Sequence, residues 1–246
     1  MGIGEFDAAK GWVQSTDFFS PPDPGETLSI FGVEGKLGEV VNKELRRSIP
    51  EGTYAGWSVP VTRGETASQP YALVIQGSWP SAGTESVPVP LDSLEVKKIV
   101  SDYLKHHGLR VENPIITQAY QVDLFGDGRL ETLITAHSDL GVLRDKEEGI
   151  VYGLTLLRTG TPEKGKTIVI AGCSYRKSVA LSIDEVTRLN GPREFYRLIA
   201  LHDIDGDGRK EIVLYRAKDE GTQIDVYACK GLRVRRVLLA YKSGFN

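Results

Sequence analysis

Two copies of an acidic, glycine-rich loop constrain the fold of this chain more than any other feature. The first copy, loop one, is Asp-Leu-Phe-Gly-Asp-Gly-Arg-Leu-Glu at residues 123–131, and the second, loop two, is Asp-Ile-Asp-Gly-Asp-Gly-Arg-Lys-Glu at residues 203–211. Six of the nine positions are identical, and the copies lie 80 residues apart. Apolar stretches rich in β-branched and aromatic residues flank each copy, which predicts a loop between two strands. The sequence therefore predicts a duplicated β unit.

Loop two has the residue spacing of a cation-binding loop. Carboxylates occur at every second position, at Asp203, Asp205 and Asp207. The interleaved glycines allow positive φ angles, which curl the backbone so that the carboxylate oxygens converge. We expect the main-chain carbonyl of Arg209 and the carboxylate of Glu211 to complete the set. Because Ca²⁺ takes oxygen ligands only, this pattern predicts a calcium site.

An EF-hand begins in the same way, but loop two departs from it in two respects. An EF-hand loop has an acidic residue at its last position and a helix on either side. The corresponding position here is Leu214, and the flanking residues 195–201 and 212–215 have strand character. Loop two is therefore interpreted as a β-turn held by calcium.

Loop one lacks one of these carboxylates, because Phe125 stands where loop two has Asp205. Its remaining acidic side chains are Asp123, Asp127 and Glu131. With less ligand charge and one oxygen fewer, loop one is expected to bind metal weakly or not at all, and its residues then serve as turn chemistry. The alternative for both loops is a polar turn whose carboxylates accept backbone N–H groups.

The 246 residues divide by composition into two parts. Residues 1–90 are expected to form an irregular arm over 1–27, a small β unit and a Pro/Ser-rich linker over 77–90, with 36–47 either strand or short helix. Residues 91–246 are expected to hold one helix and two repeats, at about 113–174 and 195–246. Each repeat is predicted to be a four-stranded antiparallel meander like a propeller blade, so that the fold is mainly β (α+β). The predicted strands are 28–33, 56–62, 71–76, 115–122, 131–136, 150–158, 167–173, 195–204, 211–217, 223–229 and 233–241.

The predicted helix precedes the first repeat. Asp92-Ser93-Leu94-Glu95 resembles a capping box, and Gly108 supplies a stop signal. Its apolar residues are expected on one side of the helix: Leu94, Ile99, Val100, Tyr103 and Leu104. A second, short helix is possible over 183–190.

The segment 203–213 resembles the core of FG-GAP and VCBS-type repeats, the calcium-binding blades of integrin α-subunits and of many secreted bacterial proteins. The resemblance covers residues 113–246 and implies metal ligands at Asp203, Asp205, Asp207, Glu211 and the carbonyl of Arg209. The Phe-Gly and Gly-Ala-Pro signatures of the integrin-type repeat are absent, and two blades cannot close a propeller ring. We therefore expect two sheets that pack with the N-terminal β unit.

Charge and composition exclude several classes of function. The net charge is −3 and the basic residues are scattered, which argues against nucleic acid as a partner. No segment is long and apolar enough for a membrane helix, and residues 1–10 carry no signal-peptide core. Because a calcium site favours the outside of the cell, we expect an extracytoplasmic location, with the leader absent from this sequence. Cys173 and Cys229 could form one disulfide there, or both could simply be buried.

Motifs for catalysis are scarce. The chain contains no nucleophile elbow, zinc-protease motif, P-loop or dinucleotide fingerprint. His137, with Asp139 nearby, and His202, next to loop two, are conceivable catalytic groups, but structural roles are favoured for both. The histidines 106 and 107 suit the end of a helix, and Trp79 is the best candidate for an exposed aromatic contact.

These observations predict a calcium-binding extracytoplasmic scaffold or binding module that is not an enzyme and whose ligand is an unidentified protein or carbohydrate. The alternative is a secreted hydrolase or carbohydrate-active protein that uses the repeats as a frame. A third possibility is a cytoplasmic protein in which both loops are metal-free turns.

Overall fold

The structure is a computed structural model that describes residues 4–7, 11–14, 25–41, 46–48, 56–58, 73–76, 85–138, 149–160, 164–177, 194–218 and 221–243. Within these ranges the chain forms one α-helix and several antiparallel β-sheets, none of which closes into a barrel. The prediction of a mainly β fold is therefore confirmed.

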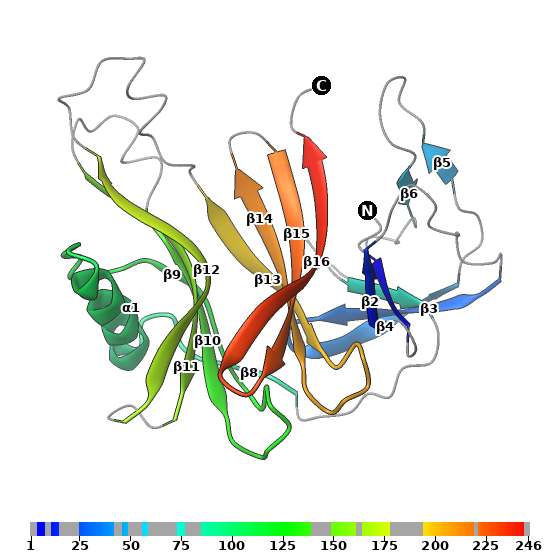
Figure 1. Ribbon diagram of the computed structural model, residues 1–246, viewed down its shortest axis with the longest axis horizontal. Coiled ribbons are helices and arrows are strands. Elements are labelled where there is room, and N and C mark those ends of the chain that lie inside the picture. Colours follow the sequence, from blue (N-terminus) through cyan, green and yellow to red (C-terminus); the bar gives the residue numbers. More distant parts are fainter. Residues whose placement is uncertain are drawn as a thin grey trace.

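Two antiparallel meanders form the centre of the molecule (Figure 1). The five-stranded sheet has the order β12-β11-β10-β9-β8 and contains β8 (Val87–Pro88), β9 (Ile116–Val122), β10 (Glu131–His137), β11 (Gly149–Thr159) and β12 (Lys166–Lys177). The four-stranded sheet has the order β13-β14-β15-β16 and contains β13 (Phe195–His202), β14 (Glu211–Lys218), β15 (Gly221–Lys230) and β16 (Arg233–Ser243). All the strands predicted in the two repeats are thus present, with shifts of a few residues at their ends.

The N-terminal part forms smaller sheets. One has the order β4-β3-β7, with β3 (Thr27–Gly32), β4 (Gly35–Val41) and β7 (Leu73–Gln76); the others pair β1 (Gly4–Asp7) with β2 (Gly11–Gln14) and β5 (Arg46–Ser48) with β6 (Gly56–Ser58). The β1–β2 hairpin lies within the arm predicted as irregular, and the ambiguous segment at 36–47 is a strand as far as Val41. Trp79, Asp139, residues 77–84 of the predicted linker and the possible helix at 183–190 lie outside the described residues.

The predicted helix is present as α1 (Leu94–His106), but its capping differs from the prediction. Ser93 is the N-cap residue and makes no side-chain capping hydrogen bond, so the capping box does not form. Leu94, predicted to be on the apolar side, is 84% exposed, and the first buried residue of α1 is Val96. The stop signal at Gly108 is confirmed, since this glycine has φ of +76° directly after the last turn. Within the described residues, no helix is long and apolar enough to cross a membrane.

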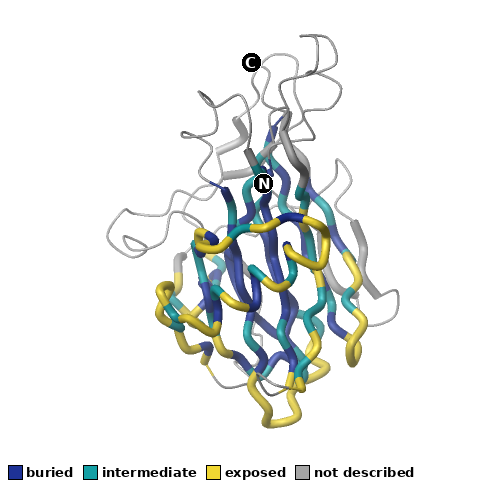
Figure 2. The backbone as a smooth tube through the Cα atoms, turned by 90° about the vertical axis from the view of Figure 1, so that its left-hand side faces the viewer, coloured by how far each residue is buried: buried dark blue, intermediate teal, exposed yellow. Residues whose placement is uncertain are grey.

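The two central sheets pack face to face between further layers, so their strands are buried over much of their length (Figure 2). Successive residues of a strand point to opposite faces, and apolar neighbours cover both faces. On β10, Ile134 faces α1, whereas its neighbour Leu133 faces the four-stranded sheet. On β14, Leu214 faces the five-stranded sheet, whereas Val213 packs with Phe31 of β3. The layers therefore follow the order α1, five-stranded sheet, four-stranded sheet, N-terminal three-stranded sheet.

Direct polar contacts hold the first strands of the two repeats together. The side chain of Gln118 on β9 accepts the N–H of Leu198 at 2.7 Å and donates to the carbonyl of Leu198 at 3.2 Å. Because Gln118 and Leu198 are equivalent positions 80 residues apart, the repeats meet in matching register. Loops one and two, which follow β9 and β13, consequently lie at the same end of the two sheets (Figure 1).

The N-terminal unit is joined to this centre. Val33 belongs to the apolar cluster between the two central sheets, and the Ser86 hydroxyl donates to the Val33 carbonyl at 2.6 Å. Val87 and Pro88 pair with β9, and the N–H of Val89 donates to the carbonyl of Ala119 at 2.8 Å. The described end of the predicted linker therefore packs as part of the five-stranded sheet.

Candidate metal centre

Loop two connects β13 to β14, as predicted, and its backbone curls in the predicted way. His202 and Glu211 are paired at the end of the ladder, so residues 203–210 form the turn. Gly206 and Gly208 have φ angles of +74° and +84°. Residues other than glycine rarely adopt a positive φ, so the backbone of the turn requires glycine at these two positions.

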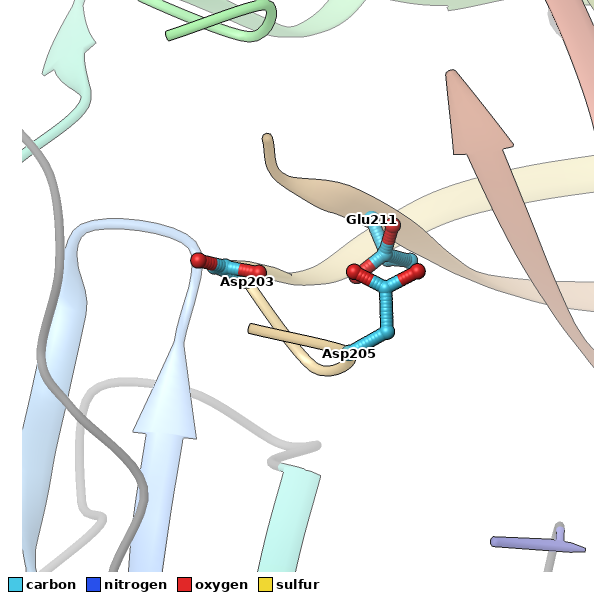
Figure 3. A group of neighbouring side chains, drawn as sticks. All are labelled: Asp203, Asp205 and Glu211. Atoms are coloured by element: carbon cyan, nitrogen blue, oxygen red, sulfur yellow. The ribbon is translucent and has the colours of Figure 1, made fainter. Parts of the chain in front are cut away.

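This turn brings three carboxylates together (Figure 3). Asp203, Asp205 and Glu211 each offer one oxygen, and these oxygens lie within 4.8 Å of one another. Asp203 and Glu211 are both 1% exposed, whereas Asp205 is partly buried. Within the described chain, this is the one group of three or more His, Cys, Asp or Glu side chains with a geometry that could hold a metal ion.

Each of these carboxylates uses one oxygen to shape the loop. Asp203 Oδ2 accepts the N–H of Gly208 at 2.9 Å, and Asp205 Oδ1 accepts the N–H of Asp207 at 3.2 Å. Glu211 Oε2 accepts the N–H of Ile204 at 2.8 Å. These backbone hydrogen bonds leave the second oxygen of each carboxylate for another partner.

The second oxygen of Asp203 carries the clearest sign of such a partner. Asp203 Oδ1 is buried and accepts no hydrogen bond. A buried polar group without a partner costs about 1–3 kcal/mol, and more when it is charged. A cation placed against this oxygen removes the cost, and the all-oxygen donor set suits a hard divalent ion. The residues present therefore fit a hard divalent cation.

The electrostatics of the cluster also favour a cation. Burial raises the pKa of Glu211 to about 8, and the Asp205, Asp207 and Asp203 carboxylates add to the rise against the opposing Ile204 N–H. Burial, followed by Asp207, raises the pKa of Asp205 as well. Without a cation the site disfavours full ionisation, because several negative charges lie close together away from water.

Asp207 and Arg209, the other two predicted ligands, are arranged differently. The Arg209 guanidinium forms an ion pair with Asp207, with an Nε–Oδ2 distance of 2.9 Å, and this contact lowers the pKa of Asp207. The guanidinium therefore lies against one of the predicted ligands. The N–H of Lys210 donates to the Leu124 carbonyl of loop one at 3.0 Å, which fixes the peptide that carries the Arg209 carbonyl.

Loop one shows the consequence of Phe125. Both oxygens of Asp123 accept backbone hydrogen bonds, from the N–H of Asp127 at 3.1 Å and from the N–H of Gly128 at 2.9 Å. In loop two the equivalent of the first bond goes to Asp205, which loop one lacks. With Phe125, loop one therefore lacks one carboxylate, and the Asp127 N–H takes up the Asp123 oxygen that corresponds to the unpartnered one of Asp203. Among the described residues, Asp123, Asp127 and Glu131 do not form a group like that of loop two. Phe125 itself packs against the apolar cluster between the sheets.

A second cluster of buried polar groups lies toward the other end of the same two sheets, and it was not predicted from the sequence. Glu194 forms an ion pair with Arg216 and accepts the hydroxyl hydrogen of Tyr196. Asp225, which is 0% exposed, accepts a hydrogen bond from Gln223 at 2.6 Å and pairs with Arg236 at 3.4 Å. Asp225 lies on the same face of β15 as Tyr227 and Cys229, which pack against the other sheet. A charged residue at alternate spacing with these apolar residues was the sequence signal that could have predicted a buried charge.

Asp225 provides a test of this cluster through pH. Burial raises its pKa, against the opposing effects of Gln223, Arg236 and Arg216. The folded protein therefore holds a proton that the unfolded chain has lost, and its stability falls as pH rises between the two pKa values. Asparagine does not titrate, so we expect the free energy of unfolding of Asp225→Asn to rise relative to that of the wild type as pH increases from about 4 to neutrality. Urea unfolding across this range measures the gain; a difference that does not change with pH would contradict it, and the exposed Asp102→Asn serves as the control.

The remaining candidate residues have structural surroundings. His202 is buried and stacks on Phe31 with ring centroids 3.9 Å apart, and His137 lies 4.9 Å from the Phe195 ring. Cys173 and Cys229 do not form a disulfide, so the disulfide alternative is not realised. Cys229 is buried, and this burial raises its pKa to about 12.

Comparison with known proteins adds no assignment: no family model, curated protein or solved structure matches this chain. The fold and the acidic site therefore define a class by themselves, namely a mainly β protein with one acidic loop that could hold a metal ion.

Proposed function

We propose that loop two binds one structural Ca²⁺ and that the protein is a calcium-stabilised, extracytoplasmic scaffold or binding module with no catalytic role. The observation that carries this proposal is the convergence of one oxygen each from Asp203, Asp205 and Glu211, in a group where Asp203 Oδ1 is buried and unpartnered. The Asp207 carboxylate and the Arg209 carbonyl remain the proposed additional ligands, which requires Asp207 to leave its ion pair with Arg209.

We propose calcium rather than magnesium because the oxygen ligands of the site form an irregular set. Ca²⁺ accepts irregular sets of carboxylate and carbonyl oxygens, whereas Mg²⁺ requires near-octahedral geometry and keeps several waters. Loop two offers carboxylates from a short, glycine-containing turn whose side chains lie at different depths. Two consecutive four-stranded meanders, each with this loop after its first strand, support the proposed relation to FG-GAP and VCBS-type blades.

The extracytoplasmic location follows from the expected affinity. Loops of this kind in extracellular modules bind Ca²⁺ with dissociation constants of about 10⁻⁴–10⁻³ M. Only a compartment with millimolar calcium keeps such a site filled. The partner of the module is proposed to be a protein or a carbohydrate.

His202, next to loop two, is proposed to have a structural role, because its ring stacks on Phe31.

Thermal unfolding with and without calcium tests the proposal. At a calcium concentration ten times Kd, linkage predicts a stabilisation of about 1.4 kcal/mol. For a chain of this size, such a change raises Tm by about 3–6 °C. Asp205→Asn keeps the shape of the side chain, removes a ligand charge and is expected to abolish the shift.

Asp127→Asn, a substitution in loop one, is the matched control and should leave the shift intact. An unchanged Tm of the wild type at millimolar calcium would refute the proposal. Equal shifts in the wild type and in Asp205→Asn would place the ion elsewhere.

A further inference from the structure

Loop one and loop two are in direct backbone contact, although they belong to different sheets. A Cβ atom added to Gly126 of loop one would lie 2.3 Å from the carbonyl oxygen of Gly208 and 3.2 Å from its carbonyl carbon. The Leu124 carbonyl of loop one accepts the N–H of Lys210 from loop two at 3.0 Å. These two contacts reach the second half of loop two, between Asp205 and Glu211.

The same half of loop two decides whether the carboxylates converge. The N–H of Gly208 donates to Asp203, so the position of Gly208 fixes one carboxylate of the cluster. Lys210 directly precedes Glu211, and its hydrogen bond to Leu124 fixes the peptide through which the chain returns to the cluster. A shift of either residue therefore moves a proposed ligand.

Loop one keeps its own shape without a cation. Both oxygens of Asp123 are occupied by backbone N–H groups, and Glu131 accepts the N–H of Leu124 at 3.0 Å. The Lys210 side chain is buried, and the carboxylates of Asp123 and Asp203, one from each loop, attract its ammonium group. Loop one thus supplies a preformed platform, and Lys210 supplies a positive charge where the two loops meet.

We propose that loop one is a positioning element of the cation site in loop two, acting through the contact of Gly126 with Gly208 and the hydrogen bond from Lys210 to Leu124. This inference rests on the proposed function. A preformed platform lowers the ordering cost of binding, because loop two is held near its bound shape before the ion arrives. Loop one thus supports the cation site of loop two rather than forming a second cation site.

Gly126 and Gly128 provide a matched pair of variants. Both glycines have positive φ angles, +69° and +81°, so alanine strains the backbone similarly at both positions. At Gly128 the added Cβ would meet nothing within 4 Å, whereas at Gly126 it would displace Gly208. A second pair, Gly126→Asn and Gly128→Asn, introduces less strain, since asparagine tolerates this conformation better.

Calorimetric titration of calcium into these four variants and the wild type measures the effect. Losing the equivalent of one hydrogen bond corresponds to about a tenfold weaker Kd. We expect this loss in both Gly126 variants and less than about a twofold change in both Gly128 variants. Equal affinity of the Gly126 and Gly128 variants would overturn the inference.

Hydrogen exchange on the wild-type protein gives an independent test that does not depend on variants that fold. Calcium is expected to slow exchange of the Lys210 amide and of the amides of Asp127 and Gly128, which belong to loop one. Slower exchange confined to loop two would contradict the inference. Failure of the wild type to bind calcium would overturn the proposed function itself, whereas binding with an unaffected loop one would overturn only the positioning role.

Discussion

Glu194→Ala is expected to destabilise the folded protein by about 3 kcal/mol, which lowers Tm by about 6–12 °C in a chain of this size. Removing one partner of a buried ion pair leaves the other charge uncompensated, and that is the main cost. Here Arg216 loses its partner, and the Tyr196 hydroxyl loses the acceptor of its hydrogen bond. The side chains of Glu194 and Arg216 are 2% and 18% exposed, so water replaces little of what is lost.

Two controls distinguish this effect from a general loss of charge. Asp102→Ala breaks the exposed pair between Lys98 and Asp102 and is expected to cost less than about 1 kcal/mol. The double substitution Glu194→Leu with Arg216→Met replaces both charges with apolar groups and should recover much of the stability. Urea unfolding measures all three changes. A cost below about 1 kcal/mol for Glu194→Ala would show that the buried pair contributes no more than an exposed one.

Phe125→Asp is expected to create a second calcium site, raising the stoichiometry of binding from one ion per chain to two. An aspartate at this position would supply the missing carboxylate. It would also accept the N–H of residue 127, as Asp205 accepts the equivalent N–H in loop two. Asp123 Oδ1 would then be free for the ion, as Asp203 Oδ1 is in loop two.

Equilibrium dialysis against calcium measures this stoichiometry. Phe125→Ala removes the same aromatic contact with the apolar cluster but adds no ligand, so it should remain at one ion per chain. A Phe125→Asp protein that folds and still binds a single ion would mean that the missing carboxylate is not what separates the two loops.

The strands of the repeats and the connections between them could be predicted from sequence because their signals are local. Short apolar runs rich in β-branched residues identify strands such as β10 and β14, and the shared Gly-Asp-Gly pattern identifies the turns that precede them. The helix and its start near Ser93 were predicted for the same reason, although the predicted capping box does not form. Asp92 and Ser93 have the right chemistry for a cap, yet their side chains do not fold back onto the helix.

The candidate site could be predicted only in part. Asp203, Asp205 and Glu211 converge because the turn geometry follows from two glycines, which the sequence displays directly. The pairing of Asp207 with Arg209 depends on side-chain conformations that spacing does not specify.

The contact between Gly126 and Gly208 arises from tertiary packing alone, because it requires the two sheets to meet in matching register. No local pattern reports this contact. The Glu194–Arg216 pair lies within one hairpin, since Tyr196 pairs with Arg216 across β13 and β14, but the burial of the pair is not visible in a local pattern.

A crystal structure grown in millimolar calcium tests the central claim most directly. The account predicts an anomalous scattering peak at loop two, at about 2.3–2.6 Å from oxygens of Asp203, Asp205 and Glu211, and no peak at loop one. The peak at loop two should disappear in crystals of Asp205→Asn. A well-ordered loop two without a bound ion, with Asp203 Oδ1 contacting only water or protein, would contradict the proposal that this protein is built around a calcium site.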